Sequence, residues 1–212
     1  MSLYGFLQHT VRAFWHLVGP LHVRGAGNVP SNGPFLLIAN HESYLDPILI
    51  QAVCPRPVRA MAKSTQFTSR FYRAIMVPLG AFPVRRFEID PQAVRQVLRA
   101  LEAGEGVCIY IEGERSWDAR LQPPRLGTVR LILKAGVPVI PCAIRGSYDV
   151  MPRWDSRIRR APVFITFGEP LRFPRLDSRA DREAVLPQAA ARITAAIQEL
   201  LDQIPQHAPA GQ

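Results

Sequence analysis

Short apolar runs of strand length alternate with longer segments of helical periodicity along most of this chain of 212 residues. The apolar runs lie at 21–24, 35–40, 58–61, 80–84, 107–111, 137–144 and 163–167. The helical patterns lie at 46–53, 64–75, 90–104, 125–135 and 180–204. Strands that alternate with helices of this length favour an α/β fold, in which helices flank a largely parallel central sheet. The length suits a single domain.

The N-terminal segment has the pattern of an amphipathic helix that ends at Gly19-Pro20. Such a helix either docks on the core or lies in a membrane interface, and its composition leaves both open. We therefore divide the chain into an N-terminal helix at 1–20, a main domain at 21–205 and a flexible tail at 206–212. The apolar stripe consists of Leu3, Phe6, Leu7, Val11, Phe14, Leu17 and Val18.

The formal net charge of +9 and the pI of about 10.3 indicate an anionic partner, which is nucleic acid, anionic lipid or a phosphorylated substrate. No nucleic-acid-binding motif is present, and the aromatic residues do not interleave with a basic stripe, so we expect no nucleic acid.

No apolar stretch is long enough to predict a transmembrane span. Cys54, Cys108 and Cys142 lack the spacing of metal ligands, so we predict no metal.

The stretch from Asn40 to Asp46 follows an apolar run and precedes a helical pattern. His41 and Asp46 are the minimum set for a general base, since the imidazole takes a proton and a carboxylate orients the ring. A second interpretation needs no chemistry, because Asp46 followed by Pro47 also fits a helix N-cap with proline at N1. Asn40 and Ser43 fit capping groups for the same helix.

Three polar clusters follow three of the predicted strands. His41 follows the first, Arg85 and Arg86 follow the second, and residues 112–116 follow the third. In open α/β sheets, ligands bind at the carboxyl ends of the strands. The pattern therefore places a base, an acid and several arginines along one edge of the sheet, which favours chemistry at His41.

Four blocks in this order resemble those of the glycerolipid acyltransferases, the lysophosphatidic acid acyltransferase family. Their order and spacing agree over roughly residues 21–170. The blocks are Asn40-His41-x-Ser43-x-x-Asp46, then Gly80, Phe82, Val84 and Arg86, then Glu112-Gly113-x-Arg115-Ser116, and finally Val137-Pro138-x-x-Pro141.

The resemblance implies a glycerolipid-acyltransferase-like fold and the transfer of a fatty acyl group from acyl-CoA or acyl carrier protein to the hydroxyl of a lysophospholipid. The acceptor it implies is 1-acylglycerol-3-phosphate, with phosphatidic acid as product. In this scheme His41 is the base and Asp46 holds its ring, without a covalent acyl-enzyme. No cofactor is needed besides the acyl donor, which is a co-substrate.

The resemblance also implies substrate-binding residues. Arg86 and Arg115 would bind the acceptor phosphate, because a guanidinium matches phosphate oxygens in pairs. Lys63 would add a point charge. Glu112 would orient the third block, and Gly113 would let the backbone approach the substrate closely. Solvated surface arginines, with Glu112 paired to one of them, are the alternative for these charges.

The chain departs from the family pattern at Tyr110, Pro83 and Glu114, of which Glu114 matters most. An acid in place of the usual threonine opposes an anionic headgroup. The acceptor is therefore another lysolipid or an amino-acid lipid, or Glu114 points away and pairs with an arginine. The arginines at 153–160 look like a solvated loop or a binder of headgroups.

We expect the protein to lie on the cytoplasmic face of a membrane as a peripheral protein, in contact with an anionic surface. The alternative from another class is a non-catalytic basic protein that binds anionic membrane or nucleic acid.

Overall fold

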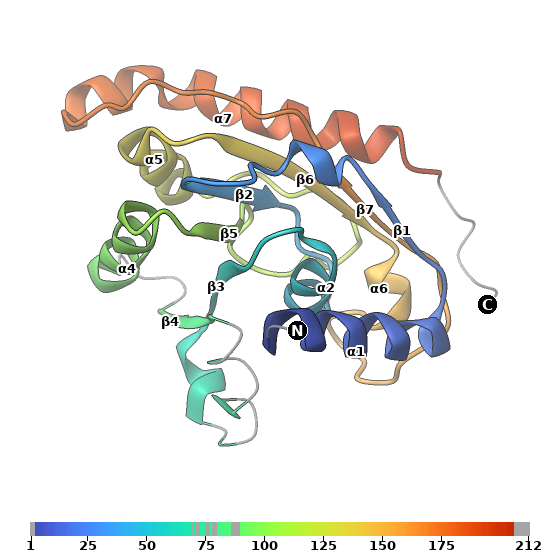
Figure 1. Cartoon of the computed structure of the whole chain (residues 1–212). Coiled ribbons are helices and arrows are strands. Elements are labelled where there is room, and N and C mark those ends of the chain that lie inside the picture. The colour runs from blue at the N-terminus through green and yellow to red at the C-terminus, as the bar shows by residue number, and fades with distance from the viewer. Residues whose placement is uncertain are drawn as a thin grey trace.

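Seven strands form one sheet in the order β1-β7-β6-β2-β5-β3-β4 in the computed structural model (Figure 1). The structure describes residues 3–68, 70, 73–74, 77, 80–85 and 90–205. The strands are β1 (Leu21–Arg24), β2 (Phe35–Ala39), β3 (Val58–Lys63), β4 (Phe82–Val84), β5 (Gly106–Tyr110), β6 (Val139–Arg145) and β7 (Val163–Phe167). The α-helices are α1 (Leu3–Val18), α2 (Asp46–Val53), α4 (Pro91–Glu102), α5 (Leu126–Ala135), α6 (Ser147–Val150) and α7 (Arg179–Asp202).

The sheet is largely parallel, as the sequence predicts. Strand β2 lies at its centre and pairs in parallel with both β5 and β6. The pair β3–β5, the pair β3–β4 and the pair β1–β7 are also parallel, whereas β6 and β7 run antiparallel. The α/β fold with a largely parallel sheet is therefore confirmed.

Helices cover both faces of the sheet, and alternate side chains of β2 divide between two cores. Leu36 and Ile38 pack with residues of α4, α5 and α7. Phe35 and Leu37 pack on the other side with residues of α1, α2 and α6. Figure 1 shows the long helix α7 along one face of the sheet, with α1 and α2 on the opposite side. Because all five residues of β2 are buried, this strand reads in the sequence as an unbroken apolar run.

One predicted helical segment differs from the structure, and one short helix was not predicted. The pattern at 64–75 begins as a 3-10 helix at Ser64–Thr68, and several later residues of this segment lie outside the described part of the chain. The loop after β6 contains the short helix α6, which the sequence analysis did not predict. The predicted tail at 206–212 also lies outside the described residues.

The amphipathic N-terminal helix is present as α1, and the side that faces the protein carries both apolar residues and hydrogen-bond donors. Gln8 Nε2 donates to the carbonyl oxygens of Gln51 and Cys54 at 3.1 and 2.8 Å, and Arg12 Nε donates to that of Ala52 at 2.9 Å. These bonds satisfy carbonyls at the end of α2, which have no partner within the helix. Trp15 is buried beside them. The helix therefore docks on the domain through α2.

The opposite side of α1 leaves part of the predicted apolar stripe in solvent. Phe6 and Phe14 are each 54% exposed, and Leu17 is 72% exposed. Core docking, one of the two predicted alternatives, therefore accounts for only one face of this helix. Among the described residues, no helix has both the length and the apolar character needed to cross a membrane.

Candidate active site

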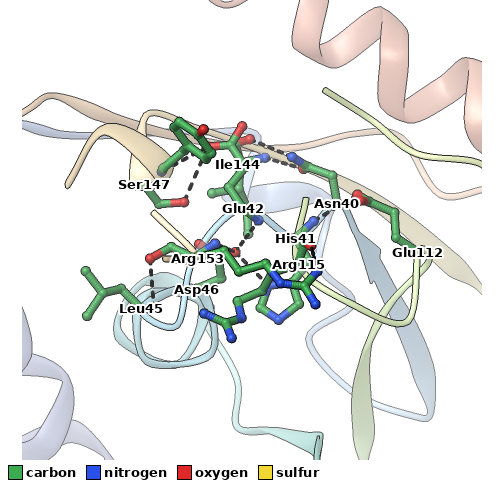
Figure 2. Close-up of polar contacts among 12 residues, drawn as sticks. Asn40, His41, Glu42, Leu45, Asp46, Glu112, Arg115, Ile144, Ser147 and Arg153 are labelled. Carbon is green, nitrogen blue, oxygen red and sulfur yellow. Dashed lines mark hydrogen bonds and ion pairs between the residues drawn. The ribbon is translucent and has the colours of Figure 1, made fainter. Parts of the chain in front are cut away.

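His41 and Asp46 form a buried pair at the carboxyl end of β2 (Figure 2). His41 Nδ1 lies 2.8 Å from Asp46 Oδ2, and the two side chains are 4% and 0% exposed. A carboxylate only accepts hydrogen bonds, so Nδ1 carries the hydrogen and Nε2 is the basic nitrogen of the neutral ring. This arrangement of imidazole and carboxylate is the one that general-base catalysis requires.

Asp46 is fixed by two further hydrogen bonds from the chain that leads to it. The backbone N–H groups of Glu42 and Ser43 donate to Asp46 Oδ2 at 2.7 and 2.8 Å. The N-cap of α2 is Leu45, and Asp46 is the first helical residue. The predicted N-cap role of Asp46 is therefore wrong: its carboxylate turns back toward the motif loop and His41.

The third sequence block holds the backbone of His41 from both sides. The N–H of His41 donates to Glu112 Oε1 at 3.0 Å, and the N–H of Ser116 donates to the carbonyl oxygen of His41 at 2.7 Å. Burial raises the pKa of Glu112 to about 8, which favours the neutral carboxyl. The predicted orienting role of Glu112 thus has a geometric basis, because it fixes the residue that carries the base.

Asn40 and Ser43 join the motif loop to neighbouring segments. Asn40 Nδ2 donates to the carbonyl oxygen of Ile144 at 2.8 Å, and Asn40 Oδ1 accepts from the N–H of Ile144 at 2.7 Å. Ser43 Oγ donates to the carbonyl oxygen of Met151 at 2.7 Å. The side chain of the N-cap Leu45 makes no capping hydrogen bond, while its N–H donates to Ser43 Oγ at 3.3 Å. The predicted capping role is therefore wrong for Asn40, and Ser43 contacts the start of α2 through the N–H of the N-cap.

Tyr110 is a functional candidate that the sequence analysis named only as a departure from the family pattern. Its ring stacks on the His41 imidazole, with centroids 3.9 Å apart and planes 16° from parallel. The register explains the contact, since Tyr110 ends β5 opposite Ala39, the residue two before His41. An aromatic residue at the end of the strand beside β2 was the available signal.

Gly113 occupies a position that a larger residue would not fit. Its φ of 72° lies in the left-handed region, and a Cβ there would lie 2.4 Å from Cδ of Arg125. Arg125 Nε in turn donates to the carbonyl oxygen of Glu112 at 3.3 Å. Glycine is thus required by the turn and by the close approach of Arg125.

The structure describes the side chain of Arg115 but not those of Lys63 and Arg86, the other two predicted phosphate-binding residues. Arg115 lies within the same block as Glu112, with its guanidinium 3.8 Å from the centroid of the Tyr44 ring. Lys63 ends β3, which pairs in parallel with β5, but its side chain is outside what the structure describes. Arg86 lies outside the described residues, so its role stays a prediction. The structure therefore brings together His41, Asp46, Glu112, Gly113 and Arg115.

Glu114 pairs with an arginine, which was one of the two predicted possibilities. Its Oε2 lies 3.0 Å from Arg153 Nη1. The same nitrogen donates to the carbonyl oxygen of Arg115 at 2.7 Å. Arg153 is thus part of the site and not a solvated loop residue, and Figure 2 draws it with Arg115 and the His41–Asp46 pair.

A pocket of about 430 Å³ opens beside the third block. Tyr110 and Gly113 line one part of it, and Met61, Ile109 and Leu131 supply apolar walls. Its volume lies within the range of sites for small-molecule ligands. Ile109 and Tyr110 are consecutive residues of β5 whose side chains enter opposite cores, so the Tyr110 ring that stacks on His41 lies on the other face of the sheet from the apolar walls of the pocket.

The sequence matches the family model described as Acyltransferase over residues 20–145, which contain all four blocks. The 1-acyl-sn-glycerol-3-phosphate acyltransferase of Bacillus subtilis is 24% identical over 206 residues, which are 95% of this chain and 100% of that protein. The chloroplastic 1-acyl-sn-glycerol-3-phosphate acyltransferase BAT2 of Brassica napus is 28% identical over 163 residues, 75% of this chain and 47% of that protein. The chain therefore spans the whole of the bacterial relative but about half of the plant one.

The crystal structure of the 1-acyl-sn-glycerophosphate acyltransferase PlsC from Thermotoga maritima has the same fold. The TM-score is 0.78 at 23% sequence identity, over 96% of this chain and 82% of that one. The predicted glycerolipid-acyltransferase-like fold is thus confirmed, together with the resemblance that the four blocks indicated. This chain belongs to the acyltransferase family.

Proposed function

We propose that this enzyme transfers a fatty acyl group from a thioester to the hydroxyl of 1-acylglycerol-3-phosphate and so produces phosphatidic acid. The observation that carries the proposal is the buried His41–Asp46 pair at the carboxyl edge of the sheet. The names of the relatives in Bacillus subtilis and Brassica napus support this acceptor.

In the reaction that we propose, His41 Nε2 removes the proton of the acceptor hydroxyl as its oxygen bonds to the thioester carbonyl carbon. The carbon–sulfur bond then breaks, and the departing thiolate takes the proton from the imidazolium. Asp46 holds the Nδ1–H side of the ring and stabilises its positive charge. No acyl-enzyme and no cofactor enter this scheme, and either acyl-CoA or acyl carrier protein can supply the thioester.

The acyl chain of a substrate fits the pocket beside the third block. Its apolar walls suit methylene groups, and Gly113 of the third block lies in its lining. Arg115 suits the acceptor phosphate, with Arg86 and Lys63 as the further cations that the family resemblance implies. An alternative acceptor is another lysolipid or an amino-acid lipid, which would carry a different group at this position.

A panel of acceptors tests the function. Purified protein is incubated with a labelled long-chain acyl-CoA or acyl carrier protein and with one of several lysolipids or a lyso-amino-acid lipid. We expect phosphatidic acid from lysophosphatidate at a kcat/KM at least about tenfold above that for the other acceptors. Acylation of another acceptor in preference to lysophosphatidate would overturn the assignment of the acceptor, and the donor that supports turnover identifies the source of the acyl group.

We also propose that α1 holds the protein on an anionic membrane surface. Its docked side faces α2, so the exposed side that carries Phe6, Phe14 and Leu17 is available to lipid. An apolar helix face on a chain of net charge +9 suits an interface of anionic headgroups. This places the enzyme where its lipid substrates are, as a peripheral protein on the cytoplasmic side.

Replacing Phe6, Phe14 and Leu17 together by serine should weaken vesicle binding by about tenfold or more, because each apolar side chain contributes when it leaves water. Sedimentation with phosphatidylglycerol vesicles measures the change. Ile158→Ser is the matched control, since Ile158 is an exposed apolar residue outside α1. Equal binding by the triple variant and the control would remove α1 as the anchor.

A further inference from the structure

The ion pair between Glu114 and Arg153 joins two segments that are distant in sequence. Glu114 lies in the third block, next to the proposed phosphate ligand Arg115. Arg153 lies in the loop after α6 (Ser147–Val150). The distance of 3.0 Å between Glu114 Oε2 and Arg153 Nη1 allows a charge-assisted hydrogen bond. Glu114, the acid that departs from the family pattern, is therefore paired with Arg153.

Arg153 is held in place by more than this pair. Its Nη1 donates to the carbonyl oxygen of Arg115 at 2.7 Å, and its guanidinium lies 3.8 Å from the centroid of the Trp117 ring. Tyr148 Oη donates to the carbonyl oxygen of Trp117 at 2.9 Å, which ties α6 to the same loop. The Arg153 side chain is only 22% exposed. These contacts keep its charge at a fixed place beside the third block.

The charges of the three side chains have a direct consequence for an anionic acceptor. The formal charges of Glu114 and Arg115 cancel, so an acid in place of threonine would weaken the attraction of Arg115 for a phosphate. Arg153 brings the group of Glu114, Arg115 and Arg153 to a net charge of +1. Since the pair is partly shielded from solvent, its field is screened less than that of a surface ion pair.

We propose that Arg153 is a specificity-determining positioning residue, which neutralises Glu114 and so keeps the site beside Arg115 selective for a lysolipid that ends in a phosphate. This inference rests on the proposed function and names how the same site recognises its acceptor. Arg153 acts through Glu114 and the Arg115 backbone, and it explains how a chain with Glu114 retains an acceptor that this acid by itself would repel.

Four proteins test the coupling: the wild type, Arg153→Ala, Glu114→Thr and the double variant. KM and kcat are measured with lysophosphatidate and with lysophosphatidylcholine of the same chain length. We expect Arg153→Ala to raise the KM for lysophosphatidate about tenfold, with a smaller effect on kcat and on lysophosphatidylcholine. In the Glu114→Thr background the same change should alter this KM by no more than about twofold, because the acid is absent.

Arg153→Lys should recover part of the loss, since lysine keeps the charge but not the planar guanidinium that lies over Trp117. Arg157→Ala is the matched control, because Arg157 belongs to the same loop, is 86% exposed and pairs with Asp155. An equal penalty for Arg153→Ala in both backgrounds, or no penalty in either, would overturn the inference. A wild type that acylates only acceptors without a terminal phosphate would overturn the proposed function itself, whatever the variants do.

Discussion

His41→Ala should abolish acyl transfer while the protein stays folded. Loss of a general base typically lowers the rate by a factor of about 10²–10⁴, and the fall should be in kcat. The fold should survive, because Asp46 Oδ2 keeps its hydrogen bonds from the N–H groups of Glu42 and Ser43 when the imidazole is gone. Initial rates with labelled acyl-CoA and lysophosphatidate measure the loss.

His22→Ala is the control for this experiment, since His22 lies on β1 and stacks on Phe164 away from the motif loop. Its activity should equal that of the wild type. Thermal unfolding of both variants separates loss of chemistry from loss of structure. A His41→Ala protein that retains more than about a tenth of the wild-type kcat would show that His41 is not the base.

The central fold could be predicted because the central strands of the sheet, β2 and β5, are buried on both faces. Such strands appear as unbroken apolar runs, as β2 and β5 do, and the helices between them show their own period. Asp90 shows that local signals also suffice for a helix end: its carboxylate accepts from the N–H groups of Gln92 and Ala93, as an N-cap does. Periodicity and capping depend on near neighbours in sequence.

The parts that the sequence did not predict depend on contacts between distant segments. The stacking of Tyr110 on His41 needs the register of two strands, and the pairing of Arg153 with Glu114 needs the course of the loop after β6. Asp46 shows a different limit of prediction from sequence, because two roles fitted the same residue. Both of its predicted roles suit an aspartate before a proline, and only the direction of its carboxylate decides between them.

In the third block, Glu112 and Gly113 were predicted as site residues, but their contacts in the structure were not predicted. Glu112 and Gly113 were predicted to orient the block and to admit a close approach. In the structure Glu112 holds the His41 backbone, and the group that approaches Gly113 closely is the Arg125 side chain. The need for an acid and a glycine is visible in the sequence. The residues that they contact, Arg125 just before α5 and His41 just after β2, are found only in three dimensions.

Asp46→Asn should remove most of the activity and leave the loop in place. An asparagine oxygen at the position of Oδ2 can still accept from His41 Nδ1 and from the N–H groups of Glu42 and Ser43. The negative charge that stabilises the imidazolium is then absent, so kcat should fall by a factor of about 10²–10⁴. The KM for the acceptor should change little, because Asp46 is fully buried behind His41.

Asp46→Ala is the informative comparison, because it removes the acceptor itself. Two buried backbone N–H groups then lack a partner, each at a cost of about 1–3 kcal/mol, so this variant should unfold at a lower temperature than Asp46→Asn. Calorimetry and steady-state rates on the two variants separate charge from structure. If Asp46→Asn kept a kcat within about threefold of the wild type, the carboxylate would serve the fold of the loop alone, and the base would work without its partner's charge.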